Sequence, residues 1–132
     1  MQSQIRYEDT IEFVPPFKEG TVIKVYDGDT ITVASKLYGD DGDDTIYRIN
    51  VRLAGIDTPE MRSNDVEIKK AAHSSQQFLS DLLLHKTVTL KNTSNEKYSR
   101  LLADVYLGDV CVNKLMIEKG YAVEYYGGTK NH

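Results

Sequence analysis

Five short segments rich in β-branched residues, none longer than nine residues, recur along the 132-residue chain. Such runs, separated by turn-forming residues, predict strands at residues 21–26, 30–34, 45–53, 86–92 and 100–107. In the third run apolar and polar residues alternate strictly, which predicts a strand with one buried face. Its inward face would hold Tyr47, Ile49, Val51 and Leu53, and its outward face Arg48, Asn50 and Arg52.

Two segments have helical periodicity instead. The first helix is expected within residues 64–84, with its apolar positions at Ala71, Ala72, Phe78, Leu79, Leu82 and Leu83. The second covers residues 112–119, with Val112, Leu115 and Met116 on one face and Gly120 at the C-terminal cap. Residues 121–126 read as extended chain. Five short strands with helices between and after them favour a small barrel of the OB type, a fold that commonly binds nucleic acids and sugars.

The charge of the chain is unevenly distributed. The formal net charge is −4, which argues mildly against a nucleic-acid partner. Residues 1–20 and the acidic turn DDGDD (residues 40–44) contain eight of the acidic residues and two of the basic ones. The remainder has 14 basic and 12 acidic residues, a net charge of +2, which permits an anionic substrate. No apolar run approaches the ~20 residues of a membrane span, so no membrane partner is expected.

Residues 1–20 are expected to form an N-terminal extension, and residues 21–132 the folded domain. The pair Pro15-Pro16 resists both helix and sheet. The extension would serve as a docking arm, complete the barrel edge or be disordered, and partial order is expected because IEFVPPF is apolar enough to pack. Its start has neither a basic segment nor an apolar stretch, so no signal peptide is expected. Location in the cytoplasm and secretion with the signal removed both stay open. The single cysteine, Cys111, is expected to be a small buried hydrophobic residue.

Two short motifs, DGDT (residues 27–30) and DTPE (residues 57–60), combine carboxylates with turn-forming residues. Taken singly, the first is a hairpin turn. The second is a helix start, with Thr58 as N-cap and Pro59 at the first helical position. Taken together, Asp29 and Asp57 would supply hard oxygen ligands to one divalent cation such as calcium.

Other residues complete the set of groups needed to attack a phosphodiester. Glu60 would take a proton from a water molecule beside the ion. Two arginines, Arg52 and Arg100, would offer planar, permanently charged groups that match phosphate oxygens.

The segments VIKVYDGDT, VRLAGIDTPE, EKYSRLLADVYL and VNKLMIEKGYAVEYY occur in that order and resemble the staphylococcal nuclease (thermonuclease) family. The resemblance spans residues 21–126. It implies an α+β fold, a five-stranded OB-type Greek-key β-barrel with two or three helices. It also implies calcium-dependent hydrolysis of DNA and RNA that leaves 3′-phosphates, on single-stranded or frayed substrates, by a protein expected to be a monomer.

The resemblance assigns a role to each residue of the motifs. Asp29 and Asp57 would be calcium ligands through their side chains, and Thr58 through its backbone carbonyl, with Asp27 as a further acid close to the metal. Arg52 would bind the scissile phosphate, and Arg100 would stabilise the transition state or assist the leaving group. Glu60 would be the base or orient the water. The nucleotide contacts implied by the resemblance are Tyr98 and Tyr126.

Two features depart from the family pattern: Ser99 and the long acidic turn DDGDD. Ser99 stands where the family usually has glycine, and it would be strained if that position needs a positive φ. DDGDD is either a solvated hairpin tip or a weak second calcium site.

The alternative functions are a non-catalytic nuclease-like module that binds nucleic acid or partners, and an OB-fold binder of single strands. The intact set of candidate catalytic residues favours the enzyme.

Overall fold

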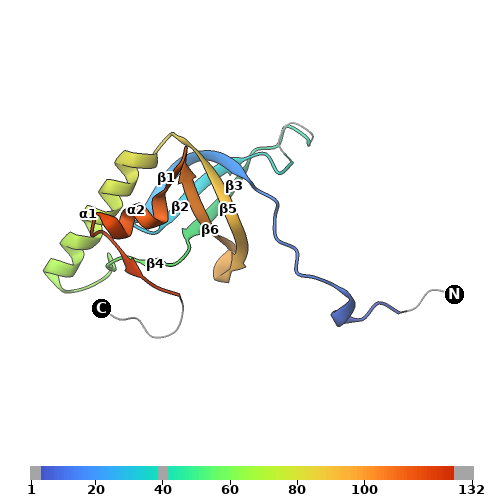
Figure 1. Ribbon diagram of the computed structural model, residues 1–132, viewed down its shortest axis with the longest axis horizontal. Coiled ribbons are helices and arrows are strands. Elements are labelled where there is room, and N and C mark those ends of the chain that lie inside the picture. The colour runs from blue at the N-terminus through green and yellow to red at the C-terminus, as the bar shows by residue number, and fades with distance from the viewer. Residues whose placement is uncertain (1–3, 39–41, 127–132) are drawn as a thin grey trace.

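The computed structural model describes residues 4–38 and 42–126. Five strands form a closed barrel, shown in Figure 1: β1 (Glu19–Asp27), β2 (Thr30–Ser35), β3 (Tyr47–Leu53), β5 (Thr87–Glu96) and β6 (Arg100–Leu107). Neighbouring strands run in the order β3-β2-β1-β5-β6, and a parallel pairing of β3 with β6 closes the ring. The α+β barrel of the OB type expected from the sequence is therefore confirmed.

Apolar side chains that alternate along the strands fill the barrel. On β3, Val51 and Leu53 are fully buried, as the alternating pattern predicted. Tyr47, at the start of the same face, is half-exposed, and its ring meets that of the buried Phe17 edge-on at 6.3 Å between centroids. Burial of such side chains contributes roughly 1.5–3 kcal/mol each, which makes this core the main source of stability.

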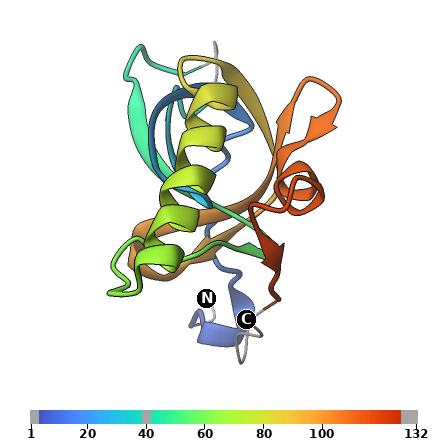
Figure 2. The same ribbon diagram turned by 90° about the vertical axis from the view of Figure 1, so that its left-hand side faces the viewer.

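Helix α1 (Val66–Leu83) lies across one side of the barrel, as Figure 2 shows. It begins at Asp65, whose carboxylate accepts hydrogen bonds from the backbone N–H groups of Glu67 and Ile68. The helix expected within residues 64–84 is confirmed, but a helix start at Thr58 is wrong. Residues 56–57 instead form strand β4 (Ile56–Asp57), which pairs with β8 (Val123–Glu124).

The buried face of α1 differs from the prediction at one position. Ala72, Leu79 and Leu83 are buried as expected, and Phe78 and Leu82 pack partly buried against the core. Ala71 is exposed, because the face turned to the barrel continues through Ser75 instead.

Helix α2 (Val112–Glu118) packs against β6 and follows the two-residue strand β7 (Val110–Cys111). Gly120 has φ +79°, the left-handed conformation that a glycine at a helix C-terminus supplies. Val112 and Met116 are fully buried and Leu115 partly so, which confirms the predicted apolar face. No helix in the described part of the chain is long and apolar enough to cross a membrane.

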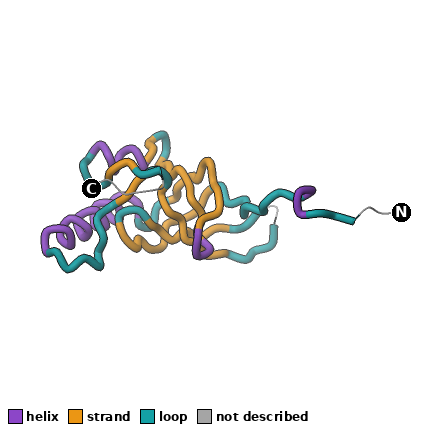
Figure 3. Tube along the Cα trace, turned by 90° about the horizontal axis from the view of Figure 1, so that it is seen from below, coloured by secondary structure: helices purple, strands orange, loops and turns teal. Residues whose placement is uncertain are grey.

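The N-terminal segment projects from the barrel, as Figure 3 shows. Its last residues run beside β5: the N–H of Leu90 donates to the carbonyl of Lys18 at 2.7 Å, and Asn95 Nδ2 donates to the carbonyl of Phe13 at 2.7 Å. Phe17 belongs to the core, whereas Ile11 is 95% exposed. Partial order was expected, and the division into extension and domain stays a prediction.

The corner between β5 and β6 is a short 3-10 turn, η3 (Lys97–Ser99), with an uncommon backbone. Tyr98 has φ +65° and Ser99 φ +60°, so the condition under which Ser99 was expected to be strained is met. In the acidic turn, Asp40 and Asp41 lie outside the described residues, and Asp43 and Asp44 are exposed.

Candidate metal and phosphate site

Strand register brings the first motif to the third strand. Thr30 of β2 pairs with Arg52 of β3, and the N–H of Leu53 donates to the carbonyl of Asp29 at 2.8 Å. The guanidinium atom Nη2 of Arg52 consequently lies 3.5 Å from Asp29 Oδ2 and 3.5 Å from Asp57 Oδ1. The two carboxylates predicted to share one cation thus face the same point, and a positive group of the protein lies between them.

The turn DGDT is built to present Asp29 inward. The N–H of Asp29 donates to Asp27 Oδ1 at 3.2 Å, and the hydroxyl of Thr30 donates to Asp29 Oδ1 at 3.1 Å. Gly28 permits close packing against the second motif. A Cβ added to Gly28 would lie 2.9 Å from Thr58 Cγ2 and 2.6 Å from Ser75 Cβ. The two motifs are therefore in direct contact.

Replacing Gly28 with alanine should lower the free energy of unfolding by about 1–3 kcal/mol, since a methyl group there overpacks a closed junction. It should also disturb the spacing of Asp29 and Asp57. Urea unfolding measures the first effect. Gly42→Ala is the control, because its added Cβ would be no closer than 3.3 Å to Tyr38 on an exposed turn. Equal stability of both variants would contradict the packing argument.

A second ion pair extends the cluster. Arg100 Nη2 donates to Glu96 Oε1 at 2.7 Å, and the same oxygen lies 4.0 Å from Arg52 Nε. The parallel register pairs Arg52 with Leu102, two residues beyond Arg100, which places both arginines on the same face. Glu96 Oε2 and Arg100 Nε are buried with no hydrogen-bond partner among the described residues.

Sequence reasoning missed Glu96. The available signal was its position in EKYSR, where a glutamate precedes an arginine by four residues. That spacing suggests an i,i+4 pair on a helix, but here the two residues face each other across the β5–β6 corner.

The pKa of Asp29 is raised to about 6, chiefly by burial and also by the neighbouring Asp27. Arg52 and the hydroxyl of Thr30 oppose this rise and only partly offset it. The fold therefore disfavours the charged form of Asp29, which a bound cation would favour.

This pKa gives the metal-free protein a defined pH dependence. The native pKa of about 6 exceeds the unfolded value of 3.8, so between these pH values the native state binds more protons than the unfolded state. The contribution of Asp29 to the free energy of unfolding therefore falls as pH rises through that window, by roughly 3 kcal/mol at about 1.4 kcal/mol per pKa unit. Urea unfolding in EDTA at a series of pH values measures the change. The difference curve against Asp29→Asn isolates it, and a flat difference curve would contradict it.

The donor set fits a divalent cation with oxygen ligands. Four carboxylates and two guanidinium groups leave two negative charges in the cluster: Asp27, Asp29, Asp57 and Glu96 against Arg52 and Arg100. Within residues 4–38 and 42–126, no three His, Cys, Asp or Glu side chains form a ready-made metal site. The fit consequently depends on two carboxylates, with backbone carbonyls and water completing the shell.

The remaining predicted residues differ in their exposure to solvent. Thr58 is buried beside the carboxylates, but Glu60 is exposed, and its backbone carbonyl accepts from the N–H of Ser63 at 3.2 Å. Tyr98 is 86% exposed, with its ring centroid 6.0 Å from Arg100 Cζ. Tyr126 is also exposed, and a Cβ on Gly55 would lie 3.0 Å from its ring.

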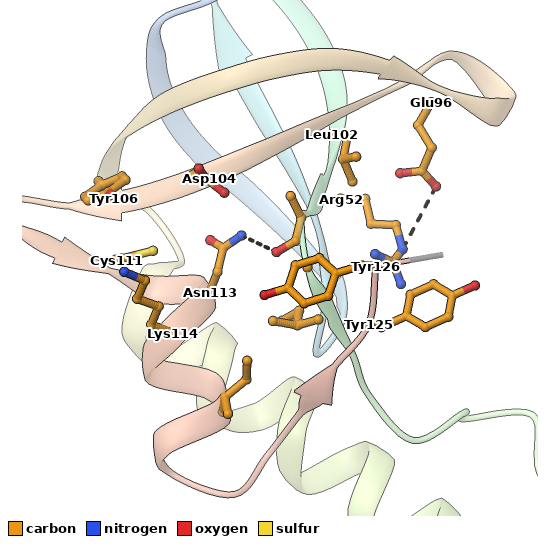
Figure 4. A pocket seen from close by; sticks show the side chains of 14 residues that line it. Arg52, Glu96, Leu102, Asp104, Tyr106, Cys111, Asn113, Lys114, Tyr125 and Tyr126 are labelled. Atoms are coloured by element: carbon orange, nitrogen blue, oxygen red, sulfur yellow. Dashed lines mark hydrogen bonds and ion pairs between the residues drawn. The ribbon is translucent and has the colours of Figure 1, made fainter. Parts of the chain in front are cut away.

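A cavity of about 630 Å³ adjoins the ion-pair cluster. Figure 4 shows Arg52 and Glu96 at one end of it, and Tyr106 and Cys111 at the other. Cys111 is half-exposed on this wall, so its expected burial is wrong: the strand β7 places it at the barrel surface. The thiol raises the pKa of the adjacent Tyr106 hydroxyl, with smaller contributions from burial and Asp104.

The chain is similar to several known proteins. Residues 50–132 match the family model described as staphylococcal nuclease homologue. An uncharacterised protein of Bacillus anthracis is 30% identical over 96% of this chain and 60% of its own length. An uncharacterised endonuclease of Escherichia coli is 32% identical over 80% of this chain and 60% of its own. A thermonuclease of Staphylococcus intermedius is 33% identical over 76% and 56%.

The chain spans about 60% of the length of these relatives. The match to the family model covers more than half of the chain, and it includes both arginines and the second carboxylate motif. The chain belongs to the staphylococcal nuclease family.

Proposed function

We propose that this protein is a calcium-dependent nuclease that hydrolyses the phosphodiester bonds of DNA and RNA and leaves 3′-phosphates. The observation that carries the proposal is the position of Arg52 Nη2, 3.5 Å from a carboxylate oxygen of Asp29 and of Asp57. The relatives named endonuclease and thermonuclease support the reaction class.

The carboxylates of Asp29 and Asp57 and the carbonyl of Thr58 would hold the calcium ion, with Asp27 supporting Asp29 from behind. When bound there, the ion would screen the phosphate charge and lower the barrier to attack by water. Both carboxylates contact Arg52, so an ion held by them would add its charge to that of the guanidinium group at the place where the phosphate binds.

Each arginine has a distinct part in this proposal. Arg52 binds the non-bridging oxygens of the scissile phosphate and the charge that develops on them. Arg100, which Glu96 orients through the 2.7 Å bond, stabilises the transition state or the leaving group. Glu60 orients or deprotonates the attacking water, and its exposed position makes it accessible to that water.

Tyr98 and Tyr126 extend the site as exposed rings on which nucleotides stack. Stacking needs unpaired bases, so single-stranded or frayed DNA and RNA are the proposed substrates, acted on by a monomer.

The test is cleavage of fluorescent single-stranded DNA with calcium, with magnesium and with EDTA, by wild-type protein and by Glu60→Ala. Glu118→Ala, an exposed glutamate on α2, is the matched control. Calcium-dependent cleavage that EDTA abolishes and Glu60→Ala strongly reduces would support the proposal. Folded protein that binds DNA in EDTA and cleaves nothing with either metal would favour a non-catalytic binding module instead.

A further inference from the structure

The end of the cavity distant from Arg52 has a polar wall that the proposed reaction does not use. Asp104, Tyr106 and Lys114 line it, and Figure 4 shows them grouped on the side opposite Glu96. At about 630 Å³ the cavity has the size of a small-molecule site, far more than one phosphate group needs. The surplus space is continuous with the proposed phosphate site.

Asp104 is held in place from behind. Asn92 Nδ2 donates to Asp104 Oδ2 at 2.8 Å. Asn92 has φ +53° and lies where the pairing of β5 with β6 shifts register between Lys91 and Ser94. A bulge of this kind re-aims a side chain, and here it directs an amide toward the carboxylate. Oδ1 of Asp104 accepts no hydrogen bond from the described residues and is the atom available to a ligand.

Asn113, another polar side chain of the cavity, already makes hydrogen bonds within the protein. Asn113 donates to the carbonyls of Ala54 at 2.8 Å and Ala103 at 3.1 Å, and it accepts from the N–H of Val105 at 2.9 Å. Its amide therefore joins α2 to the barrel. The other polar groups at this end of the cavity are the Asp104 carboxylate, the Tyr106 hydroxyl, the Cys111 thiol and the Lys114 ammonium group.

A carboxylate in a groove that takes a polyanion repels phosphate and accepts hydrogen bonds. The groups of a nucleic acid that donate are the amino and imino N–H groups of the bases. Adenine, cytosine and guanine each carry an exocyclic amino group with two N–H donors, whereas thymine and uracil have no amino group and donate only through the imino N3–H. Lysine, in contrast, suits a backbone phosphate and does not distinguish bases.

We propose that this end of the cavity is a nucleobase subsite in which Asp104 accepts a hydrogen bond from the base, so that adenine, cytosine and guanine bind better than thymine and uracil. Lys114 binds the phosphate next to that base. The inference rests on the proposed function, because it takes the cavity as the path of the nucleic acid. One hydrogen bond to a base edge discriminates by about tenfold in affinity.

Trinucleotides with a single base between two abasic positions test the subsite. Their linkages are charged phosphonates that cannot be hydrolysed. Binding can therefore be measured by calorimetry in calcium without cleavage. Wild-type protein should bind the adenine, cytosine and guanine compounds about tenfold more tightly than the thymine compound. Asp104→Asn should reduce that ratio to below about twofold, because the amide offers a donor as well as an acceptor. Lys114→Met should weaken all four equally.

Asp109→Asn, on the exposed turn between β6 and β7, is the matched control and should leave the ratio unchanged. Equal affinity of wild type for all four compounds, no binding of any, or a ratio that Asp104→Asn preserves would overturn the proposal. Cleavage of natural DNA in a parallel assay separates the two hypotheses. Cleavage without base-selective binding rejects the subsite alone, and base-selective binding without cleavage rejects the hydrolytic function alone.

Discussion

Alanine at Arg52 or at Arg100 is expected to lower the rate of DNA cleavage by about 10²–10³-fold or more, the usual effect of removing one preorganised donor to a developing negative charge. The two guanidinium groups are held before substrate arrives, Arg100 by Glu96 at 2.7 Å and Arg52 by three carboxylates within 4.0 Å. Little reorganisation is then needed in the transition state. Steady-state kinetics on a fluorescent oligonucleotide give kcat and KM for each variant.

Folding must be separated from catalysis, because Arg52 is buried among carboxylates and its loss leaves them without that cation. Arg52→Lys keeps the charge and loses the planar fork, so it should retain the fold and still lose activity. Arg48→Ala, an exposed arginine on the same strand, is the control and should keep the wild-type rate. A near-wild-type rate for folded Arg52→Ala or Arg100→Ala would remove that residue from the catalytic set.

The barrel was predictable because its strands carry their own signal. The alternating pattern ending at Leu53 fixed which face of β3 is buried, and the run from Arg100 to Leu107 has the predicted bounds. Helix starts were less predictable: Thr58-Pro59 has the composition of a cap, but pairing of β4 with β8 outweighs that local preference. Local propensity cannot report a partner strand more than sixty residues away.

The site was predictable as a set of residues but not as a network. Asp29, Asp57 and Arg52 were expected near one another, and they are in contact. Strand register places Arg52 between the two carboxylates and places Glu96 in contact with both arginines. A single sequence contains no register information between β3 and β6, since their pairing depends on how the barrel closes.

Alanine at Asp29 or Asp57 is expected to abolish the stabilisation of the protein by calcium. A ligand at 100 times its dissociation constant raises the free energy of unfolding by about 2.7 kcal/mol, which for a domain of this size is on the order of 10 °C in Tm. Wild-type protein should show this shift between EDTA and saturating calcium, and each variant should show almost none. Thermal unfolding followed by circular dichroism measures it without reference to activity. Asp81→Ala, on the exposed side of α1, is the control.

Asp29→Asn makes the expectation sharper, because its two effects have opposite signs. Without metal at pH 7.5, the native state holds a buried carboxylate whose pKa is raised to about 6, and an amide removes the cost of that charge. The variant should therefore be more stable than wild type in EDTA and less stable than wild type in saturating calcium. A stability order that does not reverse with calcium would mean that Asp29 is an ordinary buried acid and that the cation binds elsewhere. A reversal would identify the destabilising charge of the metal-free fold as the charge that binds the ion.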